Sequence, residues 1–229
     1  MNKIECDNKK PDSLRTLSFL ASAVIKKPDD YKKWMLNIYY FEIGGKGYHG
    51  STDGTRIHYV PSLGDKSTYE VAKHTKSNVV LVETPLSDYM KGKADSYVKV
   101  MPKKKNCIEM EIKLHYIYKL EGLNALICGL TGCATCFNIN FLKDLTDHMR
   151  PSCCNIRIWA PKENPYKAWR FEYYSDFQCK DFVYGAVIMP LCKDVIEANA
   201  IECLYNTKKK ECTDCVCDNG NKEGLSKAA

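Results

Sequence analysis

Residues 47–61, GYHGSTDGTRIHYVP, hold the group of polar residues whose types and spacing first point to a binding role. Thr52, Asp53 and Gly54 make a polar turn between two alternating, strand-like runs, and Arg56 follows at once. Asp accepts backbone hydrogen bonds in such turns and Gly takes the positive φ, so the plain interpretation is a hairpin turn. The apolar residues around the turn, together with Arg56, raise the alternative that it belongs to a functional site.

Catalytic chemistry has little support in the residues. The histidines have no neighbouring nucleophile or metal-ligand spacing, and GYHGS at 47–51 is not a nucleophile elbow. A glycine loop that would hold a phosphate with Lys and Ser or Thr is missing from the sequence. We therefore interpret the chain as a non-enzyme that needs no cofactor. The histidines concerned are His49, His58, His74, His115 and His148.

The cysteines raise the question of a metal. Thirteen is an odd number, and the N-terminal residues contain no apolar run of signal-peptide length, so reduced thiols and a cytoplasmic location are predicted. A CxxCxC cluster with one upstream cysteine could bind zinc through four thiolates, but the spacing differs from that of a zinc finger. Reduced thiols on a polar tail are favoured, and no metal site is assigned. The four residues are Cys203, Cys212, Cys215 and Cys217.

Composition sets wide bounds. The 229 residues are 45% hydrophobic, which suffices for a packed core. Lys and Arg outnumber Asp and Glu by 34 to 28, and this favours an anionic partner without requiring one, because the lysines are spread over separate loops. The longest uncharged apolar run is too short to cross a bilayer, so no membrane partner is predicted.

Two similar sets of elements follow from the hydrophobic patterns. Asp12 or Ser13 caps a helix that Lys26 to Pro28 end, and strands are predicted at 34–43, through Tyr48, and at 56–60. Later, a strand at 137–140 leads to a helix capped by Asn140 and limited by Pro151, and strands follow at 155–160, 168–174 and 182–191. The same order occurs twice, which predicts an α+β fold with an internal repeat. Strand-like runs at 77–84 and 108–120 are left without a place in it.

These segments resemble bacterial DNA polymerase sliding clamps, the beta subunit. The start of the middle clamp domain is similar to three segments of this chain: LASAVIKK, WMLNIYYFE and KGYHGSTDGTRIH. Residues 137–191, which end on Ile-Met-Pro-Leu, resemble the end of the last clamp domain. Residues 87–103 are compared with the connector between domains. Clamps of this type have three domains, whereas this chain has room for two units, 1–104 and 105–195, followed by a Cys-rich tail at 196–229. The alternative is one enlarged clamp domain over 12–192.

The resemblance implies a hydrophobic groove that receives linear peptides from DNA polymerase and other replication or repair proteins. Its walls would be the Thr-Asp-Gly turn, where Gly54 lets a ligand approach the backbone, and the Met-Pro strand end. Arg56 would steer acidic or carbonyl groups of the peptide. The plainer alternative is an ordinary turn and a core strand. The implied groove residues are Leu36, Thr52, Gly54, Arg56, Ile57, Pro102, Val187, Met189, Pro190 and Leu191.

The resemblance also implies that the helices hold double-stranded DNA through phosphate contacts, without reading sequence, inside a ring of identical chains. Asp144 and Asp147 dilute the positive charge, and basic residues that complement the helix dipoles are the alternative. Two other functions stay open: a clamp-derived interaction module that does not encircle DNA, and a Cys-rich metal-binding regulator. The candidate DNA-binding residues are Arg15, Lys26, Lys27, Lys143 and Arg150.

Overall fold

The computed structural model describes residues 2–26, 29–85, 87–113, 137–148, 155–164, 166–176, 178 and 180–190. The first half contains β1 (Lys3–Asp7), α1 (Pro11–Ser22), the 3-10 helix η1 (Asp30–Leu36), β2 (Asn37–Ile43), β3 (Lys46–Thr52), β4 (Arg56–Pro61), β5 (Thr68–His74) and β6 (Asn78–Thr84). The second contains α2 (Asp88–Val100), the 3-10 helix η2 (Lys104–Asn106), β7 (Cys107–Lys113), α4 (Ile139–Asp147), β8 (Asn155–Pro161), β9 (Trp169–Tyr174) and β10 (Phe182–Ile188).

The strands form a ten-stranded antiparallel sheet in the order β1-β6-β5-β2-β3-β4-β10-β9-β8-β7. Among the elements that the structure describes, strand, helix and three strands follow one another twice, once from β1 to β4 and once from β7 to β10. The two sets meet in the middle of the sheet, where β4 pairs with β10. The predicted α+β fold with helices packed on antiparallel strands is therefore confirmed.

The pairing between β2 and β5, which we call the seam, is short and has the register pairs Asn37–Glu70 and Ile38–Tyr69.

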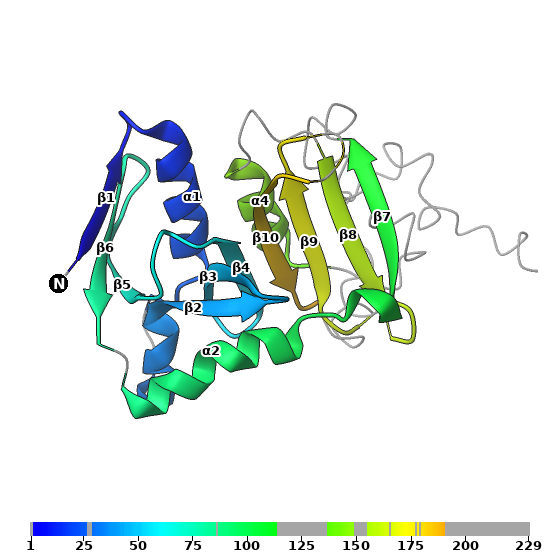
Figure 1. Cartoon of the computed structure of the whole chain (residues 1–229), viewed down its shortest axis with the longest axis horizontal. Helices are drawn as coiled ribbons and strands as arrows, with labels where there is room; N and C mark the ends of the chain where they lie inside the picture. Colours follow the sequence, from blue (N-terminus) through cyan, green and yellow to red (C-terminus); the bar gives the residue numbers. More distant parts are fainter. Residues whose placement is uncertain are drawn as a thin grey trace, which may run out of the picture.

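The helices α1 and α4 cover one face of the sheet, and α2 covers the opposite face. Along β9 the side chains alternate: Trp169, Phe171 and Tyr173 join the core that contains α1 and α4, whereas Arg170 and Glu172 face the other way. We call the side covered by α1 and α4 the helix face. Figure 1 shows these two helices beside each other, with α2 running along the lower side of the view.

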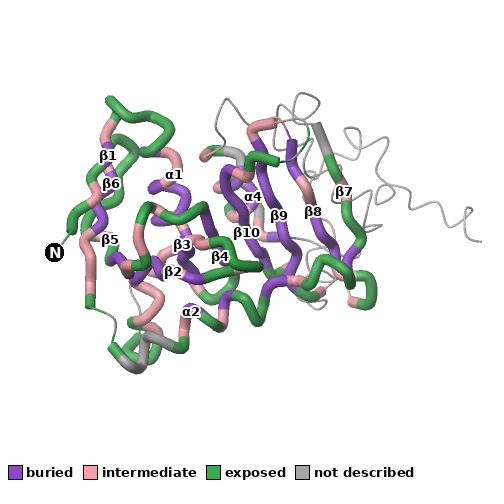
Figure 2. The backbone as a smooth tube through the Cα atoms, viewed as in Figure 1, coloured by how far each residue is buried: buried purple, intermediate pink, exposed green. Residues whose placement is uncertain are grey.

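The opposite side, which we call the α2 face, has its own apolar cluster. Ala94, Tyr97 and Met101 come from α2 and the residue after it, and they pack against Tyr39 and Phe41 of β2. The spacing of three and four residues places all three on one stripe of the helix. Figure 2 shows the burial concentrated along the central strands, while the edges of the sheet are largely exposed. The sheet thus carries one apolar cluster on the helix face and another on the α2 face.

The helix boundaries follow from local chemistry. Pro11 stands in the first turn of α1, where its fixed φ and missing N–H cost nothing, so the helix begins just before the predicted caps Asp12 and Ser13. Asn138 rather than Asn140 caps α4: its side-chain oxygen accepts the backbone N–H of Asn140 at 3.0 Å. The strand predicted at 137–140 is therefore wrong, because these residues form the cap and the first turn of the helix.

Two further segments differ from expectation. Residues 34–36, predicted as the start of a strand, belong to η1, and the strand begins at Asn37. Residues 88–100, compared with an interdomain connector, form α2. Of the two runs without an assigned place, 77–84 contains β6 and 108–120 contains most of β7. The division of the chain at 104 and 105 stays a prediction, and the helix-face core draws residues from both proposed units.

Candidate peptide groove and helix face

The turn at 52–56 is fixed by its own side chains. The Oδ1 atom of Asp53 accepts the backbone N–H groups of Thr55 at 3.0 Å and Arg56 at 3.1 Å. The hydroxyl of Thr52 donates to the carbonyl of Arg56 at 2.6 Å and accepts the N–H of Gly54 at 3.0 Å. Gly54 has a φ of +93°, which favours glycine. The sequence Thr-Asp-Gly therefore closes the β3–β4 connection in one defined shape.

The turn lies beside the strand end that the sequence paired with it. Ile57 is opposite Val187 and Arg56 is opposite Ile188 in the β4–β10 ladder. The ladder continues past β10, because the N–H of Met189 donates to the carbonyl of Thr55 at 3.0 Å. Residues about 130 positions apart in the chain thus form one continuous surface on the α2 face.

A pocket of about 220 Å³ opens between these segments. We call it the peptide groove, after the role predicted for its residues. Met189 stands at its edge with 45% of its surface exposed, which is high for a large apolar residue at a strand end. Six of the predicted groove residues line it: Thr52, Gly54, Arg56, Ile57, Val187 and Met189.

The other predicted groove residues lie elsewhere. Leu36, at the end of η1, lines a separate pocket with Ala21 and Lys73. Pro102 follows α2 and lines two other pockets, near the C-terminal end of that helix, but not the groove. Pro190 is half-buried beside Met189 and does not line the groove, and Leu191 lies outside the described residues.

Several groove residues were missed by the sequence interpretation. Trp34 and Met35 of η1 line the groove, and so do Tyr97 and Val100 of α2. The sequence patterns predict a strand from residue 34 and a connector at 87–103, where the structure has η1 and α2. A helical stripe at Ala94, Tyr97 and Met101 was the available signal for α2.

The guanidinium of Arg56 is held inside the protein. Its side chain is 8% exposed; Nε donates to Asp53 Oδ2 at 3.0 Å, Nη2 donates to the carbonyl of Ser22 at 2.7 Å, and Nη1 pairs with Asp144. The group also lies over the ring of Phe141, 4.4 Å from its centroid. Arg56 borders the groove, and its charge links the turn to α1 and α4. That its guanidinium contacts a peptide stays a prediction.

His58 sits beside this arginine on the helix face. Its ring stacks on Phe19 with centroids 4.0 Å apart, and its Nδ1 atom lies 2.7 Å from the carbonyl of Phe19 and 3.1 Å from the hydroxyl of Ser22. Burial, and then the nearby charge of Arg56, hold the pKa of His58 well below its ordinary value. The imidazole is thus neutral at pH 7 and joins α1 to β4.

Three of the candidate DNA-binding residues lie on or next to the two helices of the helix face. Arg15 is half-buried on α1, Lys26 is exposed after it, and Lys143 is exposed on α4. Lys27 and Arg150 lie outside the described residues. The structure thus puts Arg15 and Lys143 on two helices that contact each other, and Lys26 four residues beyond the end of α1.

The described part of the chain holds neither a candidate metal cluster nor a membrane-spanning helix. No group of three or more His, Cys, Asp or Glu there could hold a metal ion, and Cys6 and Cys107 are buried free thiols. Cys203, Cys212, Cys215 and Cys217 lie outside the described residues, as does the tail at 196–229. None of the described helices is long and apolar enough to span a bilayer.

Comparison with solved structures returns the family that the sequence resembles, bacterial DNA polymerase III beta subunits. The Thermotoga maritima subunit shares 9% identity, covers 83% of this chain and 65% of its own, and has a TM-score of 0.47. The Borrelia burgdorferi subunit, solved with a natural product, shares 12% identity over 84% of this chain and 64% of its own, with a TM-score of 0.47.

A third similar structure is the sliding clamp of Bartonella birtlesii bound to griselimycin. It shares 11% identity over 83% of this chain and 66% of its own, with a TM-score of 0.43. This chain therefore spans slightly less than two thirds of the length of each of these proteins. No protein-family model matches the chain, and no curated protein matches it.

Proposed function

We propose that this protein is a non-enzymatic, sliding-clamp-like tether of DNA replication or repair, which binds linear peptides of its partners in the groove between β4 and β10. One observation carries the proposal: the turn at 52–57 and the strand end at 187–189, which the sequence resemblance paired, border a common apolar pocket. Ile57, Val187 and Met189 supply anchor surface, and the exposed Met189 can adapt to different side chains.

Peptide binding is tested with Met189→Ala. A fluorescein-labelled peptide with two large apolar residues is titrated with each protein, and fluorescence anisotropy gives the Kd. Truncating a central anchor contact should weaken binding by about 5- to 30-fold, which corresponds to about 1–2 kcal/mol. Ile108→Ala is the matched control, because Ile108 is a similarly exposed apolar residue on β7, away from the groove. Equal Kd values for Met189→Ala and the unchanged protein would refute the groove.

DNA binding is assigned to the helix face. Arg15, Lys26 and Lys143 lie on or beside α1 and α4, where they can contact phosphates without reading bases. Exchanging both Lys26 and Lys143 for Glu should weaken binding to duplex DNA of any sequence. It should also lower the slope of log K against log salt by about 2, since each phosphate contact contributes about 0.9. Electrophoretic or anisotropy titrations at several salt concentrations measure both quantities.

The matched control exchanges Lys46 and Lys103, two exposed lysines on the α2 face, for Glu. It changes the net charge by the same amount on the other side of the sheet. If the control pair reduces duplex binding as much as the helix-face pair, the lysines act through net charge alone. The assignment of DNA to the helix face would then be wrong.

Assembly into a ring of identical chains completes the proposed function. Rotational symmetry closes such a ring, and chains that each supply two clamp-type units would make a six-unit ring as a trimer. Native mass spectrometry with and without DNA measures the number of chains. A particle that stays monomeric at micromolar concentration in both conditions would exclude encirclement.

A second candidate function, an interaction module that does not encircle DNA, is favoured by the charges on the helices. Asp12 stands on α1 and Asp147 on α4, where they offset Arg15 and Lys143, while Asp144 of α4 pairs with Arg56. For this candidate we expect a monomer that binds peptide in the groove and shows no salt-dependent duplex binding. The DNA titration and the mass measurement together distinguish it from the tether.

A further inference from the structure

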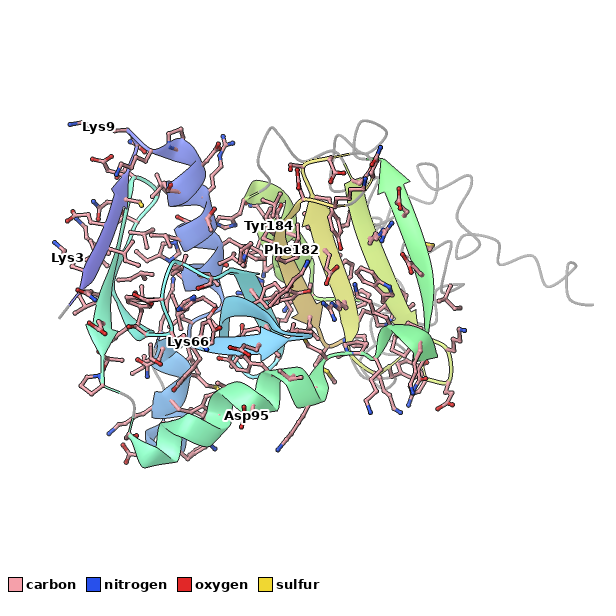
Figure 3. The ribbon with its side chains drawn as sticks, viewed as in Figure 1. Lys3, Lys9, Lys66, Asp95, Phe182 and Tyr184 are labelled. Atoms are coloured by element: carbon pink, nitrogen blue, oxygen red, sulfur yellow. The ribbon has the colours of Figure 1, made fainter. Side chains whose placement is uncertain are left out.

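A second, larger pocket lies on the α2 face, and positive charge dominates its lining. Its volume is about 490 Å³, and it is formed by β3, β9, β10 and the segment that follows α2. We call it the basic pocket. The rings of Tyr48 and Phe182, 5.6 Å apart, contribute apolar surface, and Figure 3 labels Phe182 near the centre of the molecule. Its charged residues are Lys46, Lys103, Lys104, Arg170, Lys180 and Glu172.

Among the described residues that line the basic pocket, the one carboxylate is already paired. Glu172, with a side chain 4% exposed, pairs with Arg170, accepts the hydroxyl of Tyr59 at 2.9 Å and that of Tyr174, and lies 3.3 Å from Lys104 Nζ. Burial alone would raise the pKa of Glu172, but Arg170 and Lys104 outweigh it and lower that pKa, so the group stays ionised. The carboxylate is therefore committed to the floor of the pocket.

The remaining cations have no such partner. Lys46, Lys103 and Lys180 are exposed, and within the described part of the chain their ammonium groups make no ion pair or hydrogen bond. They come from β3, from the segment after α2 and from the loop before β10, and they converge on one concave site. Like charges around a cavity focus the field and attract an anionic ligand.

The basic pocket is connected to the peptide groove through a third pocket of about 220 Å³. This middle pocket shares Val100 and Ala168 with the groove, and it shares Pro102 and Lys103 with the basic pocket. Lys99 and Lys167 line it as well, against Glu163. Three pockets therefore follow one another around the C-terminal end of α2, from apolar to basic.

We propose that the basic pocket binds an acidic segment of the same peptide whose apolar anchor fills the groove, and this proposal rests on the proposed function. Carboxylate side chains would meet the lysines, while their methylene groups pack on Tyr48 and Phe182. A peptide is favoured over a nucleic acid because the pocket is continuous with an apolar groove and lies across the sheet from the helices assigned to DNA.

The test uses two labelled peptides with the same apolar anchor. One carries a tail of four Asp and Glu residues and the other a tail of four Ser and Asn residues, and each is made with the tail on either side of the anchor. In one orientation the acidic tail should lower the Kd about tenfold in 50 mM salt, and the gain should shrink in 500 mM salt.

Charge reversal localises the effect. Exchanging Lys46 and Lys103 for Glu should remove the gain of the acidic tail and leave the Kd of the neutral-tailed peptide within about twofold. The control exchanges Lys9 and Lys76 for Glu, two exposed lysines beside β1 and β5 with the same change in net charge. Figure 3 labels Lys9 at the far end of the molecule from Phe182.

The outcomes separate this proposal from the groove itself. If both tails bind equally and the Lys46 and Lys103 reversal changes neither Kd, the basic pocket has no role and the groove stands. If the reversal weakens a single-stranded oligonucleotide but not the acidic-tailed peptide, the pocket takes nucleic acid and the proposal is overturned. If the neutral-tailed peptide does not bind at all, the proposed peptide groove is refuted. The proposal for the basic pocket, which rests on it, is then refuted as well.

Discussion

The two faces of the sheet each bury an arginine, and the two arginines are held in different ways. Arg56 on the helix face is bound by groups from three separate elements: the turn at Asp53, the end of α1 at Ser22, and Asp144 of α4. Arg170 on the α2 face is bound by Glu172, two residues along its own strand, and by the neighbouring Tyr59. Arg56 therefore joins elements that are distant in the chain, whereas Arg170 pairs within its own strand and with the neighbouring β4.

The two arginines also differ in the groups that surround them. Each nitrogen of the Arg56 guanidinium has an acceptor: Asp53 for Nε, Asp144 for Nη1 and the carbonyl of Ser22 for Nη2. The ring of Phe141 packs against the same group. Around Arg170, Glu172 is the only carboxylate that the described residues bring to the basic pocket, and the exposed Lys46, Lys103 and Lys180 line the same pocket. The same residue type thus joins separate elements on one face, and on the other it lies in the pocket that we propose for an acidic peptide segment.

The largest expected effect comes from breaking the floor of the basic pocket. Glu172→Gln leaves the charge of Arg170 buried without a counter-charge, because both side chains are less than 10% exposed. We expect the free energy of unfolding to fall by about 3–5 kcal/mol, measured by urea denaturation. Adding Arg170→Met should restore at least half of the loss. If the double variant is no more stable than Glu172→Gln, the buried charge is not the cause.

A smaller loss is expected from Arg56→Met, which tests the helix face. Asp53 and Asp144 are 21% and 27% exposed, so they can turn to water when the guanidinium is removed, and we expect a loss of about 2 kcal/mol in the free energy of unfolding. The Kd for the neutral-tailed peptide should stay unchanged. A tenfold weaker Kd with unchanged stability would instead restore the sequence interpretation, in which Arg56 contacts the ligand.

The smallest effect concerns pH. The pKa of His58 is depressed in the folded protein, so the unfolded chain binds the proton first as the pH falls below the ordinary value of about 6.5. Stability is therefore fully present above that pH, and below it is lost by up to about 1.4 kcal/mol per pH unit. Urea denaturation at pH 7.5 and 5.5 should show this slope, and His58→Gln should flatten it. An equal slope in the variant would assign the effect to His49 and His74, whose pKa values burial also lowers.

The sequence predicted well where the local pattern and the tertiary contacts agree. The strands at 56–60 and 155–160 alternate in keeping with a buried face, and the Thr-Asp-Gly turn carries its own hydrogen bonds. The motif resemblance predicts that residues 52–57 lie beside residues 187–191. The ladder between β4 and β10 pairs Ile57 with Val187 and Arg56 with Ile188, and Leu191 lies outside the described residues.

The missed parts depend on contacts distant in the chain. The sequence KGKADSYVKV at 91–100 has a weak apolar stripe, and its helix is stabilised by Tyr39 and Phe41 of β2, about 55 positions away. Asn138 and Asn140 are both good caps, and the choice between them was decided by the geometry of the first turn. The basic pocket collects lysines from three separate segments, so no run of sequence displayed it.

The short seam between β2 and β5 has a consequence for hydrogen exchange. β5 and β6 share register pairs from Thr68–Thr84 to His74–Val79, whereas β2 and β5 meet at Asn37–Glu70 and Ile38–Tyr69. Beyond those few backbone bonds, β1, β5 and β6 are held to the rest mainly by the apolar contacts of α1. These three strands should therefore open as one cooperative unit, and their amide protons should exchange before those of β8, β9 and β10.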